Sequence, residues 1–444
     1  TSKTISGSNI VLDDLIVAGG GSVSTVSPLV IAGNLTTTGT FTATAGTLSL
    51  TGASKSVTGA GALQFFALNV PGSITANKDL SISSNFSIAG SFTASAGTTT
   101  FNGTSTLSGT ANLFNISIPA TRTLTMGTSS ILGIANTVSA GGTFITTTNV
   151  PNTVNYNGTG AQAMVLSTFN NLIVSNGNTK TPPSGLTISG NFTIGSATTF
   201  VGGTFSHTLG GSWTNSGTFA ANTSTFSLTG SNDVTMTGAT TFNNLTINKG
   251  VANNVTLNNN ISALNLAMTE GTMLTGSNTI TITATRTGNG IIIGRVIRTH
   301  AYSTGVNYSF EGPNNFINFS NVGSGITSIT VLIEKTIVGG FPSGSPINRK
   351  YTVTVAGTGY TATMRLHYEE MEVNGNAEGA MTLWTDQGIA TWVNRFKSNH
   401  DTGANWVEQT GLTDIQNGWT LSDGQNVLAW SSTAVSAVWS NPAN

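Results

Sequence analysis

The sequence contains no cysteine, so disulfide bridges, thiolate metal ligands and cysteine nucleophiles are all excluded. Charged residues are nearly as scarce. They make up 7% of the chain, whereas soluble domains usually carry about 25%. The surface must therefore be covered mainly by Thr, Ser, Asn and Gly, and an uncharged surface of this kind favours stacking and lateral contact.

The sequence also lacks a basic cluster and a long apolar run. The net charge is −1, and a nucleic-acid partner requires a concentration of Lys and Arg to neutralise phosphates. Apolar runs such as Ile291-Ile292-Ile293 are far shorter than the roughly 20 residues of a membrane-spanning helix. We therefore predict no nucleic-acid partner and no membrane span.

What the sequence does contain is a repeated strand pattern. Short segments of alternating apolar and polar residues, each ended by Gly, Asn or Ser, predict β-strands joined by turns. The segment Phe169–Val174 returns nearly unchanged as Phe242–Ile247. Aligned copies of this segment follow one another at steps of 53, 48, 56 and 73 residues, with their first apolar strand residues at Leu15, Leu68, Ile116, Leu172 and Leu245.

A repeat of this kind buries its apolar face only by stacking on its neighbours. We therefore predict that residues 1–285 form a right-handed parallel β-helix, that is, a β-solenoid, with two or three coils in each unit of about 50 residues. An antiparallel β-sandwich or barrel is the alternative, because alternation does not fix strand direction. Recurrent Asn-X-Thr triplets, such as those at Asn34 and Asn191, are interpreted as turn residues rather than as glycosylation acceptors.

The composition changes near Arg286, and we place a second domain at 286–444. Of the 31 Lys, Arg, Asp and Glu residues, 20 lie from Arg286 onward, as do six of the seven tryptophans. The segments here read as longer, non-repeating strands, with a hairpin connection at Asp386–Gly388. This pattern predicts a C-terminal antiparallel β-sandwich, followed by an apolar tail after Gly424.

The segments Phe242–Asn248 and Asn278–Ile282, with Arg349–Val353, Met364–Tyr368 and Trp419–Asp423, resemble large surface proteins exported by the type IX secretion route. In that family a β-helical repeat region is followed by a sandwich. The resemblance implies export and an extracellular or cell-surface location, and says little about activity. The C-terminal sorting domain of such proteins is absent. We expect a processed, exported product, although another export route would fit equally.

Ionisable residues in the repeats are spread out. The Asp13-Asp14 pair is interpreted as a solvated strand edge rather than a metal site. Polysaccharide-degrading β-helix enzymes gather paired ionisable groups on adjacent coils, and no such group is evident. We predict no catalytic residue, no metal site and no cofactor. The one dense cluster, His367–Glu372, is compatible with Ca²⁺ but is interpreted as a charged strand end.

Four tryptophans of the second domain allow two interpretations. Indole rings often fill sandwich cores, yet the same rings could form a stacking platform for a carbohydrate. The four residues are Trp384, Trp392, Trp406 and Trp419. We favour the core and keep the platform as the alternative.

The function expected from the sequence is that of a non-enzymatic extracellular structural protein, the subunit of a filament that assembles head to tail with itself. The alternative is a surface adhesin whose sandwich binds glycans. A solenoid has open strand edges at its ends, and no amphipathic helix is available to cover the N-terminal one. We predict that the N-terminal strand of one subunit adds to the C-terminal half of the next, or that it forms the first coil of its own solenoid and assembly is lateral. The predicted contact residues are Ile10, Leu12, Leu15, Val17, Val427, Trp430, Val438 and Trp439.

Overall fold

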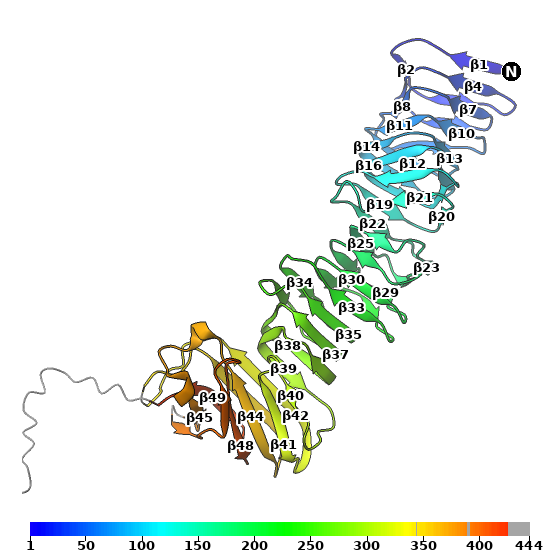
Figure 1. Ribbon diagram of the computed structural model, residues 1–444. Helices are drawn as coiled ribbons and strands as arrows, with labels where there is room; N and C mark the ends of the chain where they lie inside the picture. Colours follow the sequence, from blue (N-terminus) through cyan, green and yellow to red (C-terminus); the bar gives the residue numbers. More distant parts are fainter. Residues whose placement is uncertain (343, 389–390, 425–444) are drawn as a thin grey trace, which may run out of the picture. The chain divides into compact units, whose positions relative to one another are not determined.

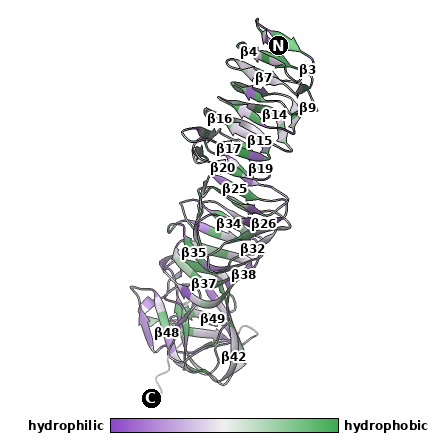
Figure 2. Ribbon diagram, turned by 90° about the vertical axis from the view of Figure 1, so that its right-hand side faces the viewer, coloured by the Kyte–Doolittle hydropathy of each residue, from purple (hydrophilic) through white to green (hydrophobic). Residues whose placement is uncertain are grey.

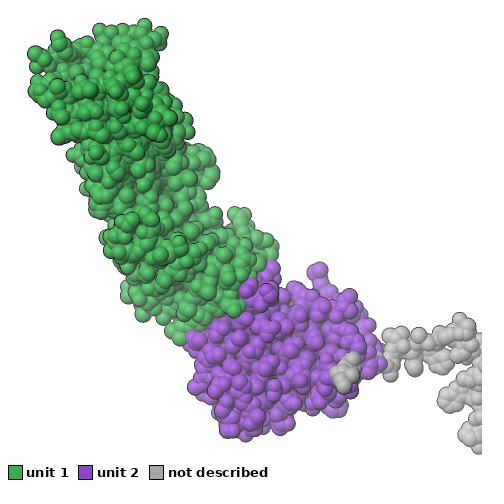
Figure 3. All heavy atoms as spheres, turned by 180° about the vertical axis from the view of Figure 1, so that it is seen from behind, with its two compact units in different colours: residues 1–273 green, residues 274–444 purple. Residues whose placement is uncertain are grey.

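The computed structural model describes residues 1–342, 344–388 and 391–424. These residues are almost entirely β-strand, and the chain divides into two compact units, Thr1–Met273 and Leu274–Asn444 (Figure 3). The first unit is a parallel β-solenoid and the second contains two antiparallel sheets, which confirms the predicted fold class. The domain boundary predicted after residue 285 lies within strand β38 (Thr272–Thr287).

The coils of the solenoid stack in parallel and form three faces (Figure 1). The first face is an eight-stranded sheet continued by a four-stranded sheet. Its strands are β1 (Ser2–Ile5), β4 (Ser22–Thr25), β7 (Thr40–Ala43), β10 (Leu63–Phe65), β13 (Leu80–Ile82), β15 (Thr98–Phe101), β17 (Asn115–Ile118) and β20 (Val138–Ala140), then β23 (Gln162–Ala163), β26 (Asn178–Thr181), β29 (Thr198–Val201) and β32 (Thr218–Ala220).

The second face runs along the whole unit. Its strands are β3 (Leu15–Val17), β6 (Leu35–Thr37), β9 (Lys55–Thr58), β12 (Ser73–Ala76), β14 (Phe86–Ala94), β16 (Thr104–Leu113), β19 (Ile131–Ile134), β22 (Thr153–Tyr156), β25 (Asn171–Val174), β28 (Phe192–Ile194), β31 (Trp213–Asn215), β34 (Val234–Thr237) and β36 (Asn254–Leu257). Strands β14 and β16 continue around the corner, since their first halves belong to the third face.

The third face completes each coil. Its upper strands are β2 (Ile10–Leu12), β5 (Leu29–Ile31), β8 (Thr47–Leu50), β11 (Ala67–Val70), β18 (Thr123–Met126) and β21 (Thr143–Ile145). Its lower strands are β24 (Thr168–Phe169), β27 (Thr187–Ile188), β30 (Ser206–Leu209), β33 (Thr225–Leu228), β35 (Thr240–Asn248) and β37 (Ile261–Glu270).

Alternation along each strand places one set of side chains in the core, and hydrophobic and hydrophilic residues accordingly mix along the strands (Figure 2). In β25, Leu172 and Val174 are fully buried, whereas the residues between and before them are half-buried. Apolar alternation with period two therefore reads correctly as inside and outside. Leu245, the matching residue of the later copy, is also fully buried, which confirms that it faces the core.

The structural repeat is the single coil, not the unit of about 50 residues. Partner residues on neighbouring coils lie about 20 positions apart, as in Leu172 and Phe192, whose numbers differ by 20. The aligned residues Leu15, Leu68 and Ile116 consequently fall on the second, third and first faces. Each face needs the same alternation followed by a turn, so similar sequences recur on different faces.

Side-chain oxygens of Asp and Asn hold one corner of the solenoid together. Asp14 Oδ1 accepts the backbone N–H of Asn34 at 2.5 Å. Asn171 Oδ1 accepts that of Asn191 at 2.8 Å, and Asn191 Oδ1 accepts that of Ser212 at 2.8 Å. These bonds link successive coils, and they give the recurrent Asn residues the turn role expected from the sequence.

The glycine before each of these corner residues follows from the same geometry. A Cβ on Gly190 would lie 2.3 Å from Asn171 Oδ1. We expect Gly190→Ala to push that oxygen off the Asn191 N–H and to lower the free energy of unfolding by about 1–3 kcal/mol. Gly160→Ala is the matched control, because a Cβ there meets nothing within 4 Å. Equal urea midpoints for the two variants would contradict this explanation.

The second unit is built from two antiparallel sheets. The first consists of β39 (Ile291–Arg298), β42 (Ser324–Glu334), β43 (Lys350–Thr358), β49 (Asn417–Ser422), β45 (Thr382–Asp386) and β46 (Trp392–Asn394). The second is five-stranded: β40 (Tyr308–Ser309), β41 (Phe316–Asn321), β44 (Thr361–His367), β48 (Trp406–Leu412) and β47 (Asn399–Asp401). Two 3₁₀ turns, η1 (Glu370–Glu372) and η2 (Glu378–Ala380), lie between β44 and β45. The hairpin predicted at Asp386–Gly388 is the β45–β46 connection.

Candidate functional sites

The first coil has an uncovered edge. Among the described residues, β1, β2 and β3 each pair with a strand on one side only, namely β4, β5 and β6. The core-facing side chains of Ile10, Leu12 and Leu15 are therefore half-buried. Their partners one coil further on are Leu29, Ile31 and Leu35, which are at most 1% exposed. The difference arises because no coil covers the first three strands.

This arrangement corrects the predicted strand donation. The residues Ile10, Leu12, Leu15 and Val17 belong to parallel strands that pair within their own chain, as the alternative prediction had it. Val17 is 2% exposed and contributes to the core rather than to an edge. The other predicted contact residues, Val427, Trp430, Val438 and Trp439, lie outside the described residues.

The four candidate platform tryptophans do not share one surface. Trp406 lies in β48 of the five-stranded sheet, where the Arg365 guanidinium sits 3.5 Å from its ring centroid. Trp419 is fully buried and donates its indole N–H to the Ile415 carbonyl at 2.9 Å. Both are core residues, as the favoured interpretation held.

The remaining pair lies together on strands β45 and β46. Phe341 contacts both rings, with centroid distances of 4.9 Å to Trp384 and 5.6 Å to Trp392. Trp384 is half-buried and donates to the Ser422 carbonyl at 3.2 Å, whereas Trp392 is only 6% exposed. This trio leaves little aromatic surface for a sugar ring.

The acidic cluster of the second unit surrounds an arginine. The Arg349 side chain is fully buried and forms ion pairs with Glu311, Glu369 and Glu372, with distances of 3.1 Å to Glu369 and 2.7 Å to Glu372. Tyr351 also donates to Glu311, at 2.5 Å. The guanidinium thus occupies the position where a carboxylate-bound cation would sit. Among residues 1–342, 344–388 and 391–424, no cluster of three or more His, Asp or Glu side chains is arranged to hold a metal.

The charge of this cluster is fixed by its neighbours. Burial alone would raise the pKa of the Glu311 carboxyl, but Arg349, His367 and Tyr351 together lower it to about 2. Burial raises the pKa of the Tyr351 phenol well above its ordinary value. Glu311 is therefore ionised and Tyr351 neutral at pH 7. The cluster is a closed ion-pair network rather than a reactive acid–base pair.

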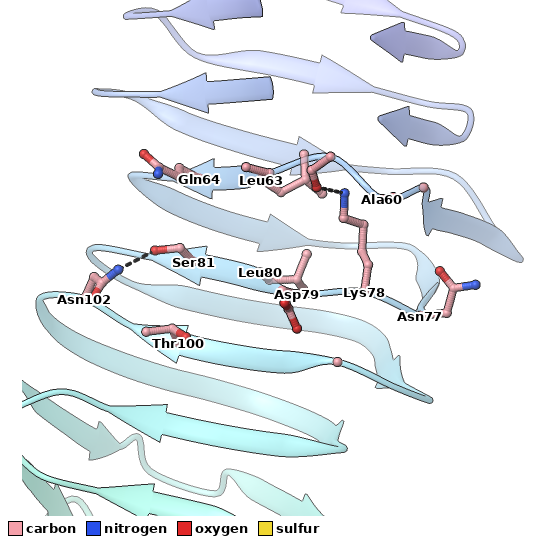
Figure 4. A pocket seen from close by; sticks show the side chains of 14 residues that line it. Ala60, Leu63, Gln64, Asn77, Lys78, Asp79, Leu80, Ser81, Thr100 and Asn102 are labelled. Carbon is pink, nitrogen blue, oxygen red and sulfur yellow. Dashed lines mark hydrogen bonds between the residues drawn. The ribbon is translucent and has the colours of Figure 1, made fainter. Parts of the chain in front are cut away.

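Three buried lysines, which composition alone placed among scattered surface charges, tie the solenoid coils together. Lys78 lies in a groove of about 600 Å³ across β10, β13 and β15, and its ammonium reaches back to the preceding coils (Figure 4). It donates to Thr37 Oγ1 at 2.5 Å and to the Gly61 carbonyl. Burial lowers the pKa of Lys78, an effect that Asp79 partly offsets.

The other two lysines repeat this arrangement. Lys180 donates to the carbonyls of Gly158 and Gly160, at 2.5 and 3.0 Å. Lys249 donates to the carbonyls of Gly210 and Thr229, at 2.9 and 2.6 Å. Both side chains are fully buried. Each ammonium satisfies carbonyls that would otherwise be unpaired, so these lysines act as ties between coils.

His207 is a second interior polar residue that sequence reasoning did not place. It is fully buried, its Nε2 lies 2.9 Å from the Gly202 carbonyl, and its Nδ1 accepts the Leu186 N–H at 3.1 Å. The ring stacks on Phe226 at 4.8 Å. Nδ1 is an acceptor and Nε2 a donor, so the arrangement requires the neutral tautomer.

Burial lowers the pKa of His207, although the Gly202 carbonyl partly opposes the shift. A lowered pKa means that the unfolded chain binds the proton more readily, so stability is present above pH 6.5 and falls as the pH drops below it. We expect hydrogen exchange in residues 200–230 to accelerate between pH 7 and pH 5 beyond the intrinsic change. The pH dependence should be flatter in His207→Gln, and identical profiles for both proteins would contradict this role.

These features define the class of protein. The chain is a β-solenoid repeat protein joined to a unit of antiparallel β-sheets. No helix in the part of the chain that the structure describes is long and apolar enough to cross a membrane. Comparison of the chain with protein-family models, with curated proteins and with solved structures finds no match.

Proposed function

We propose that this chain is a non-enzymatic structural protein whose copies assemble head to tail through the uncovered edge of the first coil. The observation that carries the proposal is the half-buried state of Ile10, Leu12 and Leu15 beside unpaired strand edges. An open edge of this type accepts a further β-strand. A strand from the C-terminal half of a second copy would cover both the apolar side chains and the backbone groups.

The contact joins two different surfaces, so it propagates into a fibre unless rotation closes it into a ring. The uncharged Thr-, Ser- and Asn-rich faces add no long-range repulsion between copies. We further propose an extracellular or cell-surface location, which the lack of cysteine permits and which the resemblance to exported repeat proteins favours.

Substitutions at the edge provide the sharpest test. Removing residues 1–17 would only transfer the open edge to β4, β5 and β6, whereas a lysine on an edge strand blocks strand addition. We expect the double variant Leu12→Lys/Leu15→Lys to remain folded and monomeric at concentrations where the unaltered protein forms fibres. Negative-stain microscopy and light scattering measure this difference.

Val11→Lys is the matched control. Val11 lies in the same strand β2 but is 64% exposed and points outward, so this variant should assemble normally. Fibres of ordinary length from the double variant would sink the proposal. So would an unaltered protein that stays monomeric at every concentration tested.

A further inference from the structure

A pocket of about 470 Å³ lies in the second unit, among the end of β38, the end of β39 and the residues before β40. Two arginines, Arg286 and Arg298, line it together with His300, Val306 and Asn307. The volume falls within the range of ordinary small-molecule sites. None of these residues takes part in the ion-pair network around Arg349.

Both guanidinium groups are buried without an acidic partner. Arg286 is 7% exposed and donates to the backbone carbonyls of Gly288, Gly290 and Glu311. Arg298 is 4% exposed and donates to the carbonyls of Ser309 and Ala284. Within the described part of the chain, neither forms an ion pair with a carboxylate.

The donors of these two arginines are not exhausted. Arg286 Nε is buried and has no hydrogen-bond partner among the described residues. Arg298 Nε donates to His300 Nε2 at 3.3 Å, so that histidine nitrogen is an acceptor and the ring is neutral. The neighbouring Glu311 carboxylate is already bound by Arg349. The pocket therefore carries two positive charges and no negative one.

Such an arrangement is electrostatically costly. A buried charge without a counter-ion destabilises the folded state. Burial lowers the pKa of Arg286 to about 10, with Glu311 raising it and the charge of Arg298 lowering it. Burial likewise lowers the pKa of Arg298. An anionic ligand in the pocket would supply the missing counter-charge.

We propose that this pocket binds the carboxylate of a sugar acid. Guanidinium groups recognise a carboxylate through paired N–H donors. The rest of the lining suits a sugar ring, since Thr283 and Asn307 offer hydroxyl and amide groups and Val306 is an exposed apolar contact. This binding is independent of assembly through the first coil.

Isothermal titration of the full chain with D-glucuronate tests the assignment, with D-glucose as the neutral sugar of the same ring and inorganic sulfate as an anion without one. We expect heat of binding with glucuronate, none with glucose and weaker binding with sulfate. Equal affinity for glucuronate and glucose, no binding of glucuronate, or tighter binding of sulfate would each overturn the proposal.

Variants locate the site. Arg298→Gln should weaken glucuronate binding about tenfold or more, because a charge-assisted hydrogen bond is lost, whereas the exposed Arg295 of the same strand can become Gln without effect. Since Arg298 also supports the fold, Val306→Glu is a second variant. Val306 is 43% exposed and lines the pocket, so its new carboxylate should neutralise the arginines and abolish binding in a folded protein. Val393→Glu, on another exposed valine of the same unit, should bind normally. Full affinity in Val306→Glu would overturn the assignment.

Discussion

Replacing Leu245 with aspartate is expected to unfold the neighbouring coils of the solenoid. Leu245 is fully buried and is stacked in register between Phe226 of β33 and Leu266 of β37. An unpaired carboxylate in this position costs several kcal/mol. Because each coil is stabilised by contact with its neighbours, the damage should spread along the stack.

Hydrogen exchange measured by mass spectrometry can follow this loss coil by coil. Protection should fall in residues 225–268, while strand β44 of the second unit keeps its protection. Thr246→Asp is the matched control, since Thr246 is the next residue of the same strand and is only half-buried. A melting temperature for Leu245→Asp equal to that of this control would contradict the expectation.

Replacing Arg349 with methionine is expected to destabilise the second unit by about 3–5 kcal/mol. Methionine has similar length and fills the space, but it leaves the fully buried Glu311 and the largely buried Glu372 without their counter-charge. Such a loss is a large fraction of the stability of an ordinary domain. Urea unfolding followed by tryptophan fluorescence measures it, because six of the seven tryptophans lie in this unit.

Lys335→Met serves as the control for Arg349→Met. Lys335 pairs with Glu369 at 2.8 Å, but its side chain is 40% exposed, and ion pairs of this kind contribute about 1 kcal/mol or less. If both variants lose the same small amount of stability, Arg349 is not the centre of the network. A double variant that also carries Glu311→Gln should recover part of the loss, since the uncompensated buried charge is then removed.

Local pattern was sufficient for the strands and for the side that each strand buries. Leu172, Leu245 and their alternating neighbours read correctly because side-chain direction in a strand depends only on parity. The sandwich strands were also recognisable, with Trp384 and Trp392 correctly placed on two hairpin-connected strands. The short strands β41 and β47 were missed, since each is bounded by polar residues and has no strong alternation.

Sequence periodicity gave the wrong length for the repeat, and this error has a physical origin. A coil of about 20 residues has three faces with the same requirements, so similarity between Leu15 and Leu68 reports a shared environment rather than a shared face. The first coil likewise carries ordinary strand sequence. Only pairing within the chain shows that it belongs to its own solenoid and leaves one edge open.

The sequence by itself determined that this protein is built of β-strands, that its first part is a stacked repeat and that a second unit follows, because alternation, turn residues and composition are local properties. The tertiary structure alone decided which polar groups meet. Arg349 and Glu311 are 38 positions apart, Lys249 and the Gly210 carbonyl are 39 positions apart, and the Arg286–Arg298 pocket requires three separate segments. Contacts between residues so distant in the chain depend on how coils and sheets close on one another, and no local pattern encodes that closure.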